Sequence, residues 1–430
     1  MLIWNEANRA QQQAALARPA VTISDELQQV VTEIIADVEL NGDEALLEYA
    51  RKFDKRTQPR LLVSAEAIQS SEDAISPELK QAIDQAYSNI RAFHALQVPT
   101  EKRLETQPGV ICELKYQPID AVGLYVPGGS APLPSSVLMQ GVCAQLAGAQ
   151  TIVLCTPVNG DQQIDPAILY AAKKCGISTI IESGGAGAVA AMALGTSSVP
   201  KVDKVFGPGN AFVTMAKQLL SQSLPGFAID MPAGPSEVLV IADERANPAY
   251  VAADLLSQAE HGPDSQVLLL SNSEKLIIEV QGELNRQLSQ LSRADIAKQA
   301  LDNSTLILVA DMEQAFAVSA EYGPEHLILQ LGEPEPYLPL VKNAGSVFVG
   351  DYTPESAGDY ASGTNHVLPT YGYSRCYSSL NLLDFYRTYT QQTISKGGLQ
   401  KLSKAILPLA QAEGLDAHAN AVKIRLENNA

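Results

Sequence analysis

AVGLYV at residues 121–126 runs directly into the Gly/Pro turn PGGSAP at 127–132. The same order, an apolar run followed by a turn and a helix-forming segment, returns at TIVLC (151–155), STIIES (178–183) and VDKVF (202–206). Strands that alternate with helices at this spacing are typical of βαβ units, whose parallel sheet is covered by helices on both faces. The sequence therefore predicts an α/β architecture.

A second series of strands and helices follows the turn MPAGP at 231–235. It contains the predicted strands EVLVIAD, QVLLLS and STLILVA, with the helix NPAYVAADLLSQAEHG and a long helix near 273–291 between them. We expect two α/β domains, the first assembled from segments on either side of the second, and a separate C-terminal arm of helix plus a final strand. The predicted boundaries are 1–23 for a small N-terminal helical segment, 24–124 with 238–378 for the first domain, 125–237 for the second and 379–430 for the arm.

The first hundred residues have a helical pattern. Ser24 can cap a helix with an apolar stripe from Leu27 to Val38, which Asn41-Gly42 ends. A second helix is predicted over 43–53, and a third begins at Ser76-Pro77.

Composition limits the possible functions. The 430 residues include 48 acidic and 30 basic side chains, a formal charge of −18, with 46 % hydrophobic residues. Such a chain is a poor partner for nucleic acid or anionic lipid, whereas its field favours a cationic substrate. We find no run apolar enough to span a membrane and no secretory signal in MLIWNEANRAQQQ. Five widely spaced cysteines without a CxxC motif are typical of reduced thiols, so we expect a cytoplasmic protein.

The five histidines are the first candidates for chemistry. His94 lies beside the apolar stripe of the third helix, and we expect it at the edge of the core or bonded to solvent. The others lie in Gly/Pro-rich or helix-terminal contexts, which often position functional groups. In SQAEHGPD, Gln258 and His261 are three residues apart on one helix face and could share a ligand, although a polar last turn explains them equally well.

The remaining candidates pair histidine with a carboxylate. Glu325 and His326 begin an apolar strand and could act as two general bases, or simply face water. The polar, Gly-rich loop that holds Asp359 and His366 is typical of a site lining or a mobile segment, and Glu413 and His418 fit a solvated helix surface. A metal would gather oxygen and imidazole ligands without thiolate, which suits Zn²⁺, Co²⁺ or Mn²⁺; spacing alone does not select the candidate set Gln258, His261, Asp359 and His418.

Cofactor signals are present but individually unspecific. Gly185-x-Gly187-x-x-Ala190 follows a strand and opens a helix, with Asp203 eighteen residues after Gly185, as in a dinucleotide fingerprint. Tight helix–sheet packing explains the glycines equally well. PGGSAP and GPGN (207–210) offer two further helix starts that could accept an anion. Together the three turns favour a nucleotide-binding protein.

Several long strings resemble one family, the histidinol dehydrogenases. They are VGLYVPGG, VDKVFGPGNAFVT, AIDMPAGPSEVLVIAD, DLLSQAEHGPDSQV, YGPEHLI, AGSVFVGD and PESAGDYASGTNHVLPTYG. The resemblance covers nearly the whole chain. It implies two incomplete Rossmann-like domains and a zinc homodimer, with one Zn²⁺ per subunit, whose C-terminal arm completes the partner's site. It also implies oxidation of L-histidinol to L-histidine through bound L-histidinal with two NAD⁺, the last two steps of histidine biosynthesis.

The resemblance also implies roles for particular residues. The zinc ligands would be Gln258, His261, Asp359 and His418, and the acid–base pair would be Glu325 and His326. Substrate would contact Ser236, His366 and Glu413 as well as the four ligands and His326. NAD would contact Tyr125, position 187 and Asn210. The family usually has Gln in this GGAQA segment where the chain has Gly187, so a backbone group or water would have to replace that amide contact.

The residue types suit this chemistry. A neutral histidine can take the hydroxyl proton as hydride leaves, and a carboxylate can activate the water that hydrates the aldehyde. Zn²⁺ that holds the amine and imidazole of the substrate acts mainly as a template, and binding the neutral amine releases a proton, so activity should rise with pH. One alternative is a cysteine hemithioacetal on Cys112 or Cys155, and another is a metal-held binding protein without redox activity.

Overall fold

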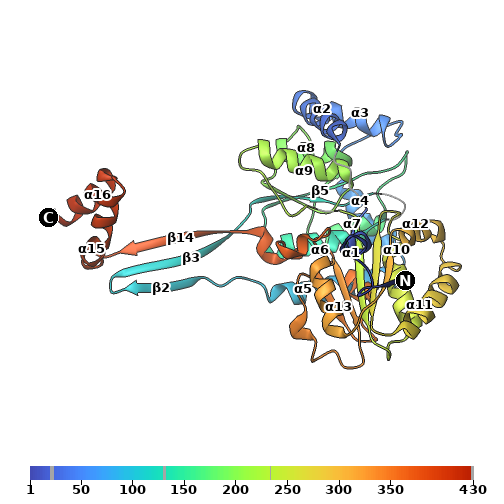
Figure 1. Ribbon diagram of the computed structural model, residues 1–430. Coiled ribbons are helices and arrows are strands. Elements are labelled where there is room, and N and C mark those ends of the chain that lie inside the picture. Colours follow the sequence, from blue (N-terminus) through green and yellow to red (C-terminus); the bar gives the residue numbers. More distant parts are fainter. Residues whose placement is uncertain (20–23, 129–131, 233, 428–430) are drawn as a thin grey trace. The chain divides into compact units, whose positions relative to one another are not determined.

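The computed structural model describes residues 1–19, 24–128, 132–232 and 234–427, so parts of the predicted turns PGGSAP and MPAGP lie outside the described residues. The chain divides into two units (Figure 1). Unit 1 comprises residues 1–97 and 120–382, and unit 2 comprises residues 98–119 and 383–430. Within the described part of the chain, no helix combines the length and apolarity needed to cross a bilayer.

The first sheet of unit 1 is entirely parallel. Its strand order among the described residues is β1-β11-β10-β9-β12-β13. The strands are β1 (Leu2–Ile3), β9 (Glu237–Ala242), β10 (Gln266–Ser271), β11 (Thr305–Leu308), β12 (His326–Gln330) and β13 (Ser346–Val349). The chain leaves β9 in one direction through β10 and β11, and then returns to the other side of β9 as β12. This confirms the predicted series of strands and helices in this half of the chain.

Helices cover both faces of this sheet. They are α10 (Pro248–Ala259), α11 (Glu274–Leu288), α12 (Ala294–Asp302), α13 (Met312–Tyr322) and, after β13, the short α14 (Glu355–Tyr360). All six residues of β9 are buried, because alternate side chains enter two different cores. Val238 and Val240 pack with α10 and α11, whereas Leu239 and Ile241 pack with α13. A strand buried on both faces therefore has no polar alternation.

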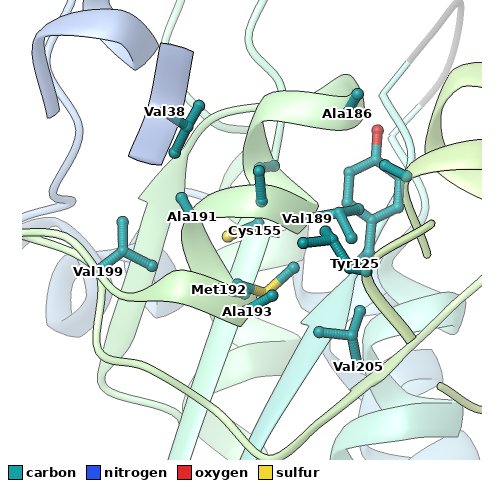
Figure 2. Close-up of a cluster of buried hydrophobic side chains, with 14 of the residues drawn as sticks. Val38, Tyr125, Cys155, Ala186, Val189, Ala191, Met192, Ala193, Val199 and Val205 are labelled. Atoms are coloured by element: carbon teal, nitrogen blue, oxygen red, sulfur yellow. The ribbon is translucent and has the colours of Figure 1, made fainter. Parts of the chain in front are cut away.

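The second sheet of unit 1 is also parallel, in the order β6-β5-β4-β7-β8. Its strands are β4 (Ala121–Tyr125), β5 (Thr151–Thr156), β6 (Thr179–Glu182), β7 (Lys204–Phe206) and β8 (Ala228–Ile229). The helices that connect them are α6 (Pro134–Ala147), α7 (Pro166–Lys174), α8 (Gly185–Leu194) and α9 (Ala211–Ser223). Figure 2 shows small side chains of α8, such as Ala191 and Ala193, packed with Cys155 and Val205 of this sheet.

The N-terminal segments form α1 (Arg9–Leu16), α2 (Asp25–Asn41), α3 (Asp43–Lys52), α4 (Ala65–Ser70) and α5 (Pro77–Ala95). Ser24 and Ser76 cap α2 and α5 as predicted. The prediction that 24–124 belongs with 238–378 needs correction at two places. Helix α2 packs against α8 and α9, and α3 packs against α8 (Figure 1), while β4 pairs with β5 and β7. The apolar stripes of α2 and α3 therefore pack on helices of the second sheet, and the periodicity of a stripe does not identify that partner.

Unit 2 contains an antiparallel sheet and two helices. Its strands β2 (Lys102–Gln107), β3 (Val110–Pro118) and β14 (Tyr386–Ile394) pair in the order β14-β3-β2. Two helices follow, α15 (Lys396–Ala412) and α16 (Asp416–Glu427) (Figure 1). The predicted order of a helix and then a final strand is wrong. The strand β14 comes first and pairs with β3, and both helices follow it.

Four short 3₁₀ segments complete the described elements. They are Ser71–Asp73, Leu338–Leu340, Tyr373–Arg375 and Leu382–Phe385.

Candidate active site

Glu325 and His326 lie where β12 begins, beside the first residues of β9. Strand β12 pairs with β9 and β13, so His326 lies opposite Val238 and Ser346. Gly323 ends α13 in a left-handed conformation, with φ of 67°, and the chain turns from there into the strand. Both side chains are almost fully buried, Glu325 at 5 % and His326 at 4 % exposed. The bland interpretation of a pair facing bulk water is therefore excluded.

The Glu325 carboxylate is held by the backbone. The amide of Glu237 donates to Glu325 Oε2 at 2.9 Å. Burial raises the pKa of Glu325 to about 8; the positive field of His326 and this hydrogen bond oppose the rise, whereas the Glu237 and Asp359 carboxylates add to it. A carboxyl group with a pKa near neutrality can accept and return a proton under physiological conditions.

His326 connects the acid–base pair to a further carboxylate. Its Nδ1 donates to the carbonyl of Glu237 at 3.1 Å, and its Nε2 lies 3.6 Å from Asp359 Oδ1. Burial alone would lower the pKa of His326, but the carboxylates of Glu355, Glu325 and Asp359 outweigh it and raise that pKa well above its ordinary value. Nε2 has no hydrogen-bond partner among the described residues.

One group of side chains beside His326 is arranged to hold a cation. Ligand atoms of His261, Glu355 and Asp359 all lie within 4.8 Å of one another. His261 follows the end of α10, while Glu355 and Asp359 are one turn apart on α14. Burial lowers the pKa of the His261 imidazole, which favours the neutral form that ligates metals. His261 and Asp359 are predicted ligands; Glu355 was missed, although its spacing of four from Asp359 in ESAGD is a usable signal.

Gln258 lies in contact with this group and is fully buried. With its amide nitrogen toward Glu355, it donates to both carboxylate oxygens, at 3.2 Å to Oε2. Burial raises the pKa of Glu355 to about 8. The positive field of His326 opposes this rise in the pKa of Glu355. At Asp359 burial would also raise the pKa, but His326, His366 and His261 keep it below its ordinary value. The donor set of carboxylate, imidazole and amide oxygen fits a divalent cation such as Zn²⁺.

A cavity of about 310 Å³ opens beside these groups, and a substrate of small-molecule size fits it. Its lining includes Ser236, His261, Glu325, His326, Asp359 and His366. The His366 imidazole is fixed on both sides, by the Asp359 carbonyl at 2.8 Å from Nδ1 and by Ser136 Oγ at 3.2 Å from Nε2. The structure thus brings most of the predicted substrate contacts to one cavity.

Two predicted site residues belong to unit 2. Glu413 caps the C-terminal end of α15 and His418 lies in α16, both with exposed side chains. Their roles stay predictions.

A second cavity, of about 450 Å³, lies at the carboxyl ends of β4, β5 and β6. Tyr125, Gly187 and Asn210, the three predicted cofactor contacts, all line it. Tyr125 is largely buried, and its hydroxyl accepts the Gly185 amide at 3.1 Å, so this helix start already has a partner (Figure 2). Asn210 caps α9 by accepting from the amides of Phe212 and Val213. Open parallel sheets commonly bind nucleotides at this edge.

Gly187 has a packing role in the second cavity wall. A Cβ at this position would lie 3.2 Å from Tyr49 Cδ2 and 3.4 Å from Leu46 Cδ2. The missing side chain thus allows α3 to approach α8, which favours close packing over the dinucleotide fingerprint as the reason for this glycine. The sequence pattern predicts packing of a helix on the sheet at this glycine, whereas the structure shows packing between two helices.

The buried cysteine candidate is a poor nucleophile. Cys155 is fully buried in β5, and burial raises the pKa of its thiol well above the ordinary value. Cys112 lies in β3 of unit 2. Neither residue is among those that line the cavity beside His326.

Unit 1 combines two parallel sheets with a cavity lined by a buried acid–base pair and by side chains that could hold a cation. These features define an α/β enzyme that acts on a small molecule. A family model described as histidinol dehydrogenase matches residues 17–426. The histidinol dehydrogenase of Pseudoalteromonas translucida (strain TAC 125) is 70 % identical over 427 residues, 99 % of each chain. That of Idiomarina loihiensis is 55 % identical over 424 residues, covering 99 % of this chain and 96 % of that protein.

The structural comparison agrees. The crystal structure of histidinol dehydrogenase from Elizabethkingia anophelis superimposes with a TM-score of 0.94 at 48 % identity, covering 98 % of this chain and 96 % of that one. The chain belongs to the histidinol dehydrogenase family and is an oxidoreductase.

Proposed function

We propose that the protein oxidises L-histidinol to L-histidine through bound L-histidinal, with two NAD⁺ as hydride acceptors and one Zn²⁺ per subunit. The observation that carries the proposal is the convergence of Glu325 and His326 with the His261, Glu355 and Asp359 group on one cavity. Family membership supports the substrate and the place of the reaction in histidine biosynthesis.

His326 would act on the alcohol. Its Nδ1 proton is held by the Glu237 carbonyl, so the nitrogen available to the substrate is Nε2, which is buried and unpartnered among the described residues. As hydride leaves the carbinol carbon for NAD⁺, Nε2 takes the hydroxyl proton and the aldehyde forms. Ionisation of this imidazole is thus coupled to the charge of the neighbouring carboxylates.

Glu325 would act on the aldehyde. Water adds to the carbonyl carbon while the carboxylate accepts one of its protons, which gives the gem-diol. His326 releases its first proton to solvent before the second oxidation. The second hydride then passes to NAD⁺, a hydroxyl proton of the gem-diol passes to His326, and the acid is formed. A carboxyl group with a pKa near 8 is increasingly ionised as pH rises, in agreement with the expected rise in activity.

Gln258, His261 and Asp359 would hold the cation together with His418 of the partner subunit in a homodimer, with Glu355 beside them. When bound, Zn²⁺ would supply a template for the amine and imidazole of the substrate. Ser236, His366 and Glu413 would contact the substrate. Tyr125, Gly187 and Asn210 would line the NAD site, with the backbone at Gly187 replacing the side-chain amide.

The proposal is tested by mixing zinc-loaded protein, L-histidinol and NAD⁺ and recording the absorbance of reduced nicotinamide. We expect two NADH per L-histidine and loss of turnover after zinc is removed, with recovery when zinc returns. His326→Asn should lower kcat by about 10²-fold or more while zinc content is unchanged.

The alternative is a metal-held binding protein without redox activity. Such a protein would bind L-histidinol in a zinc-dependent manner and form no NADH. That result would defeat the proposed function, whereas a fully active Cys112→Ser/Cys155→Ser variant would eliminate the covalent route.

A further inference from the structure

An ion pair between the partly buried Arg18 and the buried Glu237 lies directly behind the acid–base residues. Glu237, the first residue of β9, is 1 % exposed, and its carboxylate receives two parallel hydrogen bonds from Arg18. The distances are 2.5 Å from Arg18 Nε to Oε2 and 2.8 Å from Nη2 to Oε1. A planar guanidinium that meets a carboxylate in this way fixes both the position and the orientation of the carboxylate.

Glu237 and Glu325 bind each other's backbone. The Glu325 amide donates to Glu237 Oε1 at 3.2 Å, and the Glu237 amide donates to Glu325 Oε2 at 2.9 Å. The carboxylate of one residue thus sets the backbone position of the other. Since His326 Nδ1 also donates to the Glu237 carbonyl, both members of the acid–base pair depend on this one residue.

Arg18 also binds the turn that leads to Glu325. Its Nη2 donates to the carbonyls of Tyr322 at 2.9 Å and Gly323 at 3.2 Å, and its guanidinium lies 3.9 Å from the centre of the Tyr322 ring. The Tyr322 hydroxyl lies 3.1 Å from Glu237 Oε2 and 2.8 Å from Gln266 Oε1, and these two oxygens share its single proton. The Glu237 carboxylate therefore accepts from two nitrogens of Arg18 and from the Glu325 amide, with the Tyr322 hydroxyl beside it.

We propose that Arg18 and Glu237 are positioning residues that hold the Glu325 carboxylate in place for hydration of the aldehyde. Neither residue was singled out by the sequence patterns. Arg18 precedes Glu237 by more than two hundred residues, so only folding brings them together. The inference rests on the proposed function, because it assigns Arg18 and Glu237 to the second oxidation of that reaction.

A purely stabilising role does not account for this geometry. Buried ion pairs add little net stability over apolar side chains, because desolvation offsets their attraction. Here the Glu237 carboxylate also accepts a hydrogen bond from the backbone amide of Glu325, and Glu325 lines the cavity. A pair that serves the reaction should affect one oxidation more than the other.

The test measures the two hydride transfers separately in zinc-loaded protein: the first as the pre-steady-state rate of NADH formation from L-histidinol, the second as turnover of L-histidinal. Glu237→Gln replaces one carboxylate oxygen by an amide nitrogen, so at least one donor of Arg18, Tyr322 or Glu325 faces another donor. We expect the rate with L-histidinal to fall about 10- to 100-fold, at least ten-fold more than the pre-steady-state rate of the first hydride transfer, with little change in KM.

Arg18→Lys should lie between Arg18→Met and the parent, because a lysine restores the charge without the two parallel bonds. The matched control is Glu283→Gln, which alters another bidentate pair, with Arg286 on the exposed face of α11. Its rates for the first and the second hydride transfer should equal those of the parent.

An equal loss in both oxidations, or no loss in either, would overturn the inference. If the parent itself reduces no NAD⁺ with either substrate, the proposed function fails and the inference falls with it. A parent that is active with both substrates, beside variants that do not separate them, defeats the inference alone.

Discussion

Glu355 shows how a single carboxylate can be easy to overlook and still be central. It is 1 % exposed and lies within ligand distance of His261 and Asp359, and it receives the amide of Gln258. Sequence patterns favoured histidines and their neighbours, and Glu355 has no histidine near it in the chain. Burial raises its pKa to about 8, so the positive field of His326 or a bound cation would favour the ionised form that can act as a ligand.

We predict that Glu355→Gln weakens zinc binding by about 10- to 100-fold, because the carboxylate adds negative charge and orients the Gln258 amide. Competition with a chromophoric chelator measures the affinity. Glu335→Gln, at an exposed position, is the matched control and should bind zinc like the parent. Equal affinity in both variants would remove Glu355 from the cation site.

Asp254 on α10 predicts a pH-dependent stability. It is 5 % exposed, and burial raises its pKa to about 6, although the hydrogen bond from Gln330 Nε2 at 3.1 Å opposes the rise. Because the folded pKa exceeds the unfolded one, this carboxyl group contributes its full stability below about pH 4. The contribution is lost as pH rises through about 6, a change of at most about 3 kcal/mol.

Asp254→Asn cannot ionise and should therefore gain stability relative to the parent as pH rises from about 4 to 7. Urea unfolding of both proteins at several pH values measures the difference. Asp302→Asn, at an exposed position, should show no such trend. A difference between Asp254→Asn and the parent that is constant with pH would contradict the assignment.

At the scale of elements, the sequence predicted the ends of a helix or strand correctly where a capping residue or a turn lies at that end. Ser24 and Ser76 cap α2 and α5, and the strand at 121–125 ends at its Gly/Pro turn. Local signals could not show that α2 packs on α8, since a stripe of apolar residues does not identify its partner. Similarly, β14 lacks a clear alternation of polar and apolar side chains, so the sequence did not predict its pairing with β3, about 270 residues away.

The contact between α3 and α8 at Gly187 predicts that the effect of Gly187→Ala on the free energy of unfolding changes sign when Tyr49 is removed. Gly187→Ala places a Cβ 3.2 Å from Tyr49 Cδ2, so we expect a loss of about 1 kcal/mol in the free energy of unfolding. In a Tyr49→Ala background the space is open, and the better helix propensity of alanine should give a gain of about 0.5–1 kcal/mol. Urea unfolding of the four proteins measures the coupling, and additive effects would contradict it.

At the scale of the whole molecule, the cavity beside His326 is lined both by residues at the amino ends of β9 and β12 and by residues after the carboxyl ends of β4 and β7, such as Pro127 and Gly207. The cavity with Tyr125 and Asn210 lies at carboxyl ends, as the general rule for open parallel sheets expects. Glu325 and His326 instead lie at the amino ends of β9 and β12. Topology rules therefore direct attention to the cavity with Tyr125 and Asn210. Residue patterns offered Glu325 with His326, Gln258 with His261 and Asp359 with His366 only as separate candidates, and the resemblance of strings such as GPEH and SQAEHGPD to a family placed them in one site.

The C-terminal arm is the part of the proposal that concerns two chains. Glu413 and His418 are exposed in unit 2, as side chains that act on another subunit would be. If His418 completes the partner's site, a chain with His418→Ala and a chain with His326→Asn have complementary defects. In a mixed dimer, the site built on the His418→Ala chain receives an intact His418 from its partner.

Co-expression of the two inactive variants should therefore restore activity. With random pairing, half of the dimers are mixed and each contains one complete site, so about a quarter of the parental turnover per subunit is expected. Each variant expressed alone is the control and should be inactive. If His418 served its own chain, every site in the mixture would carry one defect, and co-expression would restore nothing.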